Sequence, residues 1–224
     1  EARFDLALIG THLSRIGEEW VLWTSEEFGF ATLDDRYATG SSMLPQKKNA
    51  DIAELARGKA GRLIGNLTGL LTTLKGLPLA YNRDLQEDKE PLFDSYDQVS
   101  LAVGALTGMI QTATFNSDRM REAADVQSLS ATDLAEYLVR KGTPFRQAHA
   151  LVGELVQKAI SGSQSLQQLV ADSPEFDADA LQLIGTGVGV QLRSSPGASG
   201  PHAAEDQRAR FASVIASLRT SLAI

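Results

Sequence analysis

The sequence predicts an all-α protein, in which a bundle of long helices is followed by a small C-terminal helical domain. Three long segments repeat apolar residues at steps of three to five, as amphipathic helices do, and short polar stretches join them. Beyond about Asn116 the segments become shorter, and Gly and Pro separate them. We therefore predict a first domain at residues 1–124 and a second at residues 125–224.

Composition excludes several classes of protein. The chain has 224 residues, 43% of them hydrophobic and 22% charged, which suits an ordered protein with a sizeable core. Its 21 basic and 28 acidic residues give a formal charge of −7, which argues against binding nucleic acid through a general field. No apolar run reaches the roughly 18–20 residues that span a bilayer, so we expect a soluble chain with no membrane partner.

The cysteine and histidine content limits which metal sites and thiol chemistry the chain could have. The chain contains no cysteine, as expected for a reducing compartment such as the cytoplasm. Its three histidines are scattered and do not have the spacing of metal ligands. We therefore predict no metal site and no cofactor.

The first helix is predicted from residue 4 to about residue 28. It begins without a cap, so we expect that the chain starts inside a domain and that an upstream part is missing. Its apolar positions form one stripe: Phe4, Leu8, Leu13, Ile16, Trp20 and Trp23.

Two more long helices are predicted, at residues 49–75 and 93–115. Asn49 is a good N-cap for the first of them, and Pro78 follows its end. Small residues such as Ala53, Gly58 and Gly61 interrupt its apolar stripe, and we expect them to let a neighbouring helix approach closely. The stripes are more extensive than a monomer would cover, so we expect self-association.

The second domain has clear helix signals. Thr132 is expected to cap a helix that runs through Arg140, and Thr143 and Pro144 are expected to start another that reaches about Ile160. The remaining predicted elements are short helices at 166–171 and 177–184, a short strand at 188–192 and a closing helix at 203–222.

Two polar stretches are candidates for binding a ligand. The loop at residues 38–49 combines a glycine, three hydroxyls, an amide and two adjacent lysines, and it leads into the positive end of a helix dipole. That composition suits an anion-binding loop, although a solvated basic loop without function is the alternative. The run at residues 81–90 holds many polar types, and by itself it reads as a surface loop with weak salt bridges.

Residues 40–49, GSSMLPQKKN, closely resemble the signature loop of the fumarase/aspartase superfamily, GSSxMPxKxNP. The Gln-Lys-Lys version resembles the argininosuccinate lyase family in particular. Residues 81–90 also resemble that family, at its usual spacing from the loop. Leu44 replaces the usual Met and Ala50 the usual Pro. The likeness covers residues 6–115, weakens beyond, and indicates the C-terminal half of such an enzyme.

The resemblance implies reversible β-elimination of argininosuccinate to arginine and fumarate, by a cytoplasmic homotetramer whose sites combine residues of three subunits. It implies Ser41 as the base, Lys47 as the group that stabilises the dianion, and Asn49, Tyr81, Gln86 and Lys89 as substrate-binding residues. Two alternatives remain. The chain could be a non-catalytic, crystallin-like scaffold, or another lyase of the superfamily that releases fumarate from a different adduct.

Overall fold

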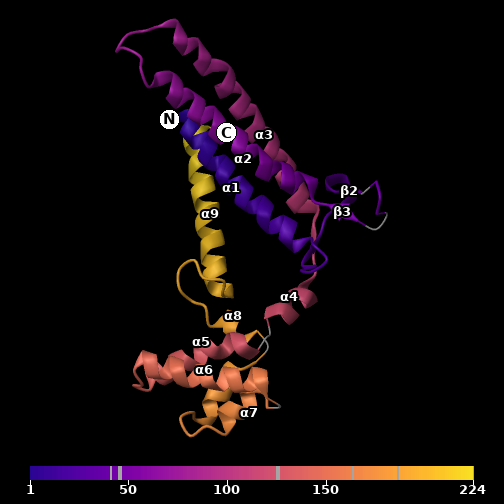
Figure 1. The fold of residues 1–224 in the computed structure, drawn as a ribbon, viewed down its shortest axis with the longest axis vertical. Helices are drawn as coiled ribbons and strands as arrows, with labels where there is room; N and C mark the ends of the chain where they lie inside the picture. Colours follow the sequence, from indigo (N-terminus) through magenta and orange to yellow (C-terminus); the bar gives the residue numbers. More distant parts are fainter. Residues whose placement is uncertain (41, 45–46, 125–126, 163, 186, 224) are drawn as a thin grey trace. The chain divides into compact units, whose positions relative to one another are not determined.

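The computed structural model describes the chain except for residues 41, 45–46, 125–126, 163, 186 and 224 (Figure 1). Helices dominate the described residues, and the predicted all-α class is confirmed. The chain divides into two compact units, Glu1–Ser117 and Asp118–Ile224. The predicted domain boundary near Ala124 stays a prediction. Within the described residues, no helix combines the length and apolar character that crossing a membrane requires.

Three long helices build the first unit: α1 (Ala2–Trp23), α2 (Asp51–Leu74) and α3 (Lys89–Thr112). They run side by side, and α1 packs most extensively on α2 (Figure 1). The α1–α2 connection contains β1 (Ala31–Thr32), η1 (Asp35–Tyr37), β2 (Thr39–Gly40) and β3 (Lys48–Asn49), while η2 (Arg83–Asp88) precedes α3 and β4 (Thr114–Phe115) follows it. The antiparallel pairs are β1 with β4 and β2 with β3.

Small residues bring α1 and α2 together, but the decisive glycines lie on α1. A Cβ added at Gly17 would stand 2.4 Å from the carbonyl oxygen of Ala53, and one at Gly10 would collide with the side chain of Leu63. Ala53 is fully buried at this contact. The expected close approach therefore depends on backbone-to-backbone packing between the two helices.

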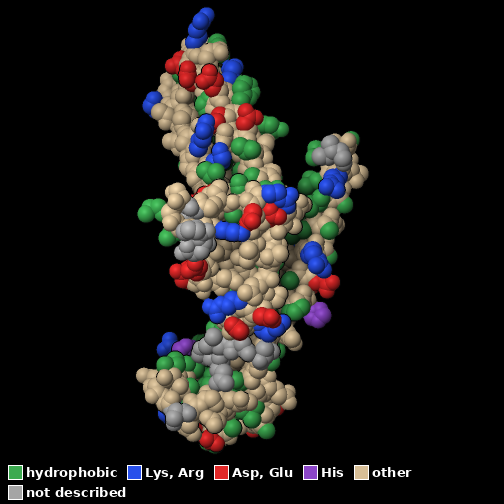
Figure 2. Space-filling model, turned by 90° about the vertical axis from the view of Figure 1, so that its right-hand side faces the viewer, with side chains coloured by type: hydrophobic (Ala, Val, Ile, Leu, Met, Phe, Trp, Pro, Cys, Tyr) green, Lys and Arg blue, Asp and Glu red, His purple; other side chains and the backbone are tan. Residues whose placement is uncertain are grey.

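The predicted apolar stripes are largely exposed in the single chain. Phe4 on α1 is 57% exposed, Leu55 on α2 is 58% exposed, and Tyr96 on α3 is 65% exposed. An added Cβ at Gly58 or Gly61 would meet nothing within 4 Å. Figure 2 shows hydrophobic side chains at the surface of the helical bundle, in its upper part. Such exposure is what the expected self-association requires, and self-association itself stays a prediction.

Two predicted helix starts also differ from the structure. α2 begins at Asp51 after Ala50 and has no side-chain cap, because Asn49 pairs with Thr39 in the β2–β3 ladder. α3 begins at Lys89, four residues earlier than predicted, because η2 leads directly into it. As a result, Asn49 belongs to a strand and Lys89 to a helix.

The second unit is a small cluster of helices. These are α4 (Ser117–Ala124), which begins at the last residue of the first unit, η3 (Gln127–Ser130), α5 (Ala131–Arg140), α6 (Phe145–Ser161), α7 (Leu166–Ala171), η4 (Ala178–Leu183), α8 (Val188–Gln191) and α9 (Pro201–Leu222). Its core joins Leu134, Val152, Leu166 and Val170, all of them buried. Buried Asp133 pairs with Arg193, whose Nη1 lies 2.7 Å from Oδ1, and this pair ties the segment after α8 to α5.

Two predictions for this unit are wrong. The strand expected at 188–192 is the helical turn α8, since the amide of Gln191 donates to the carbonyl of Gly187 and the backbone is satisfied locally. Thr132 lies inside α5, which Ser130 precedes at the N-cap position. By contrast, α7 has the predicted bounds and a complete capping box between Ser165 and Gln168.

Candidate active site

The first polar stretch forms a hairpin immediately before α2. Strands β2 and β3 pair Thr39 with Asn49 and Gly40 with Lys48, so the two ends of the loop meet at the N-terminus of α2. The predicted base, Ser41, lies outside the described residues, as do residues 45–46. Of the predicted site residues in this hairpin, the structure describes Lys47, which is exposed, and Asn49, which is half-buried.

Two aspartates anchor this hairpin. Asp51, the first residue of α2, accepts a hydrogen bond from the amide of Thr39 at 3.0 Å and another from the Thr39 hydroxyl. Lys48 forms an ion pair with Asp35 in η1. These contacts connect one strand of the hairpin to α2 and the other to η1. The sequence left open whether Asp35 would pair with the lysines, and it gave no indication that Asp51 would bind Thr39.

The segment that carries Asp35 is itself braced. Asp34 caps η1 by accepting from the amide of Arg36, and it also pairs with the Arg36 side chain at 2.9 Å. The hydrogen bonds from the Arg36 side chain and backbone lower the pKa of Asp34 to about 2, so this carboxylate stays charged. The sequence left open which of these charged groups would pair.

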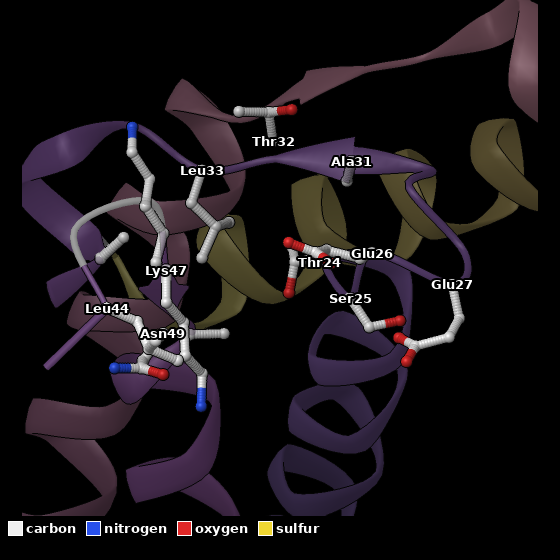
Figure 3. Close-up of a pocket in the computed structure, with 13 residues that line it drawn as sticks. Thr24, Ser25, Glu26, Glu27, Ala31, Thr32, Leu33, Leu44, Lys47 and Asn49 are labelled. Atoms are coloured by element: carbon white, nitrogen blue, oxygen red, sulfur yellow. The ribbon is translucent and has the colours of Figure 1, made fainter. Parts of the chain in front are cut away.

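The hairpin borders a pocket of about 560 Å³. Lys47 and Asn49 contribute to one side of it, and Ser25 and Glu27, in the turn after α1, contribute to the other (Figure 3). Leu33 and Ala31 add apolar surface. The pocket therefore combines cationic, amide, hydroxyl and carboxylate groups beside the N-terminus of α2, where unpaired amides and the helix dipole favour an anion.

The second polar stretch gathers the other three predicted residues. The amide of Gln86 donates to the hydroxyl of Tyr81, and both side chains are exposed. Lys89, at the start of α3, donates to the Asp88 carboxylate at 3.0 Å and to the Leu85 carbonyl at 3.4 Å. The structure therefore brings Tyr81, Gln86 and Lys89 onto one short exposed segment.

The two polar stretches do not meet within one chain. The hairpin precedes α2 and the segment with Gln86 follows it, and Figure 1 shows them at opposite ends of the bundle. Asp88 shares the guanidinium of Arg3 with Asn66, and Asn66 lies 66 − 51 = 15 residues, or about 22 Å of helix, beyond Asp51. Lys47 and Asn49 are thus separated from Lys89 by most of the length of α2. Among the described residues, no three His, Asp or Glu side chains are grouped so that they could hold a metal ion.

Comparison with known proteins identifies the family. A family model described as "Argininosuccinate lyase C-terminal" matches residues 128–186, and one described as "Lyase" matches residues 1–65. The argininosuccinate lyase of Renibacterium salmoninarum is 53% identical over 95% of this chain and 46% of that relative, and that of Saccharopolyspora erythraea is 49% identical over 100% and 48%. The chain belongs to the argininosuccinate lyase family. It spans about half the length of the curated relatives it matches.

Solved structures of other lyases resemble this chain over most of its length. An EDDS lyase in complex with formate is 31% identical, with a TM-score of 0.86 over 99% of this chain and 47% of that one. A variant of EDDS lyase with bound fumarate gives a TM-score of 0.85 at 29% identity, with the same coverage. The class II fumarase of Schistosoma mansoni is 16% identical with a TM-score of 0.73 over 86% of this chain and 39% of that one, which shows a shared fold.

Proposed function

We propose that this chain is the C-terminal part of an argininosuccinate lyase, which cleaves argininosuccinate reversibly to arginine and fumarate in the cytoplasm. The observation that carries the proposal is the hairpin with Lys47 and Lys48 at the N-terminus of α2. It occurs in a chain whose sequence is 53% identical to a curated argininosuccinate lyase. Such a site needs neither metal nor cofactor, because fixed positive charge and N–H donors stabilise the reacting carboxylate.

The proposed chemistry is a β-elimination. A base removes the proton from the carbon beside a carboxylate, which leaves an aci-carboxylate dianion; the C–N bond then breaks as the leaving guanidinium nitrogen is protonated. We assign Ser41 as the base on its place in the signature sequence. We assign Lys47 to stabilise the dianion, because its positive charge favours the negative charge that develops in the transition state leading to it. In the described part of the chain Lys48 pairs with Asp35, whereas no ion pair of Lys47 is found.

The proposal places substrate binding across subunits of a homotetramer. Asn49 of one subunit and Tyr81, Gln86 and Lys89 of another would contact the same substrate. Two features support this arrangement: the stretches lie at opposite ends of α2, and the exposed stripes on α1, α2 and α3 supply apolar surface for helices of neighbouring subunits. An antiparallel neighbour would bring opposite ends of the bundle together.

The test uses the complete product of the gene that encodes this chain. Incubation with argininosuccinate should release fumarate, followed by its ultraviolet absorbance, and arginine in equal amount. The same assay on this chain alone, and on this chain mixed with the N-terminal half of a relative, shows what each part contributes. An absence of fumarate from the complete product would refute the proposal and favour the scaffold alternative.

A second candidate is a lyase that releases fumarate from another amine adduct. It is favoured by the likeness to EDDS lyase, which is 31% identical over nearly the whole chain. Adenylosuccinate, aspartate and ethylenediamine disuccinate, assayed beside argininosuccinate at equal concentration, separate the two candidates. Turnover of one of these in preference to argininosuccinate would establish the second.

A further inference from the structure

Arg3, in the first turn of α1, is a buried charge with an unusual set of partners. Only 4% of its surface is exposed. Buried guanidinium groups ordinarily pair with carboxylates. Among the described residues, however, Arg3 has no ion pair, and its hydrogen bonds go to backbone carbonyls. Nη1 donates to Asn66 on α2 at 3.1 Å, while Nη2 donates to Glu87 at 3.5 Å and, more closely, to Asp88.

The bound carbonyls lie at the junction where η2 leads into α3. Glu87 and Asp88 are the last residues of η2, and α3 begins at Lys89. Four residues after Glu87 stands Pro91, which has no N–H to donate back to the Glu87 carbonyl. The guanidinium of Arg3 supplies a donor there, so a side chain of α1 holds the junction between η2 and α3.

Further polar groups secure the same junction. The side-chain amide of Asn66 donates to the carbonyl of Pro91 at 3.3 Å, to Asp94 at 2.9 Å and to the hydroxyl of Ser95 at 3.0 Å. Ser95 is 1% exposed, and its hydroxyl donates to Pro91 at 2.6 Å. Arg3, Asn66 and Ser95 together join α1 and α2 to the junction between η2 and α3.

We infer that Arg3 is a positioning residue for substrate binding, acting through the backbone of residues 87–88. Gln86 and Lys89 directly precede and follow residues 87–88, so the orientation of both side chains depends on the backbone that Arg3 holds. The inference rests on the proposed function, which assigns Gln86 and Lys89 to the substrate. Arg3 lies beside the end of α2 opposite the hairpin, so it should affect substrate affinity rather than the proton-transfer step.

The test compares Arg3→Ala and Arg3→Lys in the complete gene product with Arg15→Ala, which removes an exposed arginine from the same helix. Arg3→Ala should raise KM for argininosuccinate about tenfold with kcat changed less than about twofold. Arg3→Lys keeps the charge but lacks the fork that reaches two elements, so it should recover part of the loss. Arg15→Ala should match the wild type.

Hydrogen exchange gives a readout that does not depend on activity. In Arg3→Ala, amides of residues 83–89 should exchange faster, while those of residues 48–51 should not change. Equal acceleration throughout α2 and α3 would mean that Arg3 only stabilises the bundle, and this would overturn the inference. An unchanged KM in an active, folded Arg3→Ala would do the same. If Arg3→Ala does not fold, the KM and exchange of Arg3→Lys decide. A wild type that releases no fumarate refutes the proposed function instead.

Discussion

At the scale of single residues, two adjacent lysines have different surroundings. Both border the pocket, but Lys48 is in strand β3 and its ammonium pairs with Asp35, whereas Lys47 precedes the strand. Because the charge of Lys48 is already paired with Asp35, we expect Lys48 to hold the hairpin and Lys47 to act on a ligand. Their substitutions should therefore have different consequences.

Lys47→Met should lower kcat of the complete enzyme by at least about a hundredfold, because it removes charge that stabilises the dianion. Lys48→Met removes an exposed ion pair and should cost no more than a few-fold. Fumarate release measures both, and circular dichroism checks that each variant is folded. Equal losses in the two variants would contradict this division.

Tyr137 offers a test of the second unit by pH. Its hydroxyl donates to Asp179 at 2.6 Å, and this bond, with burial and the charge of Asp177, raises the pKa of Tyr137 to about 12. A raised pKa means that the contribution to stability is complete below pH 10 and disappears as the pH rises through 12. Ultraviolet titration should show one of the four tyrosines ionising late.

The matched variants for that titration are Tyr137→Phe, which should remove the late phase, and Asp179→Asn, which should move it toward ordinary pH. A titration of the wild type in which all tyrosines ionise together near pH 10 would show that the hydrogen bond to Asp179 does not persist in solution.

At the scale of elements, the α1–α2 pair depends on the absence of a side chain. Gly17→Ala would place Cβ 2.4 Å from the Ala53 carbonyl, so the helices must separate, at a cost of about 1–3 kcal/mol in the free energy of unfolding. Gly153→Ala in α6 is the matched control: its Cβ meets nothing within 4 Å, and helix propensity should add up to about 1 kcal/mol. Urea unfolding measures both, and destabilisation by both would contradict the packing argument.

Periodicity predicted the helices of the first unit well, because the 3.6-residue repeat of apolar side chains does not depend on which partner covers them. It did not indicate which positions touch within one chain, since Phe4 and Leu55 are exposed there and the contact between α1 and α2 uses Gly17 and Ala53. The strand predicted at 188–192 failed because a short apolar run does not distinguish a strand from a helical turn.

The candidate site was predictable only as far as its motif extends. Lys47, Asn49 and Lys89 follow from their places in two recognisable stretches, and their roles stay predictions. Asp51 reads from sequence as an ordinary acid in the first turn of a helix, and only the fold shows it holding Thr39. The role of Arg3 could not be predicted from the sequence. Its partners are backbone carbonyls more than 60 residues away, and every residue has such a carbonyl.

At the scale of the whole molecule, a shared site makes a distinctive prediction. Lys47→Met and Lys89→Met variants should each be nearly inactive, since each lacks one half of every site. Dissociating and reassembling an equal mixture should restore about a quarter of wild-type activity, because some sites then draw both intact lysines from different subunits. The fumarate assay measures the recovery, with each variant reassembled alone as control. No recovery in the mixture would place both lysines in one subunit's site.

The two polar stretches are held by bonds of different kinds. Two side-chain carboxylates, those of Asp35 and Asp51, hold the hairpin. Arg3 instead holds residues 87–88 through their backbone carbonyls, which every amino acid carries. A mutation at position 35 or 51 can therefore loosen the hairpin directly, whereas residues 87 and 88 can change identity and still offer Arg3 the same acceptors.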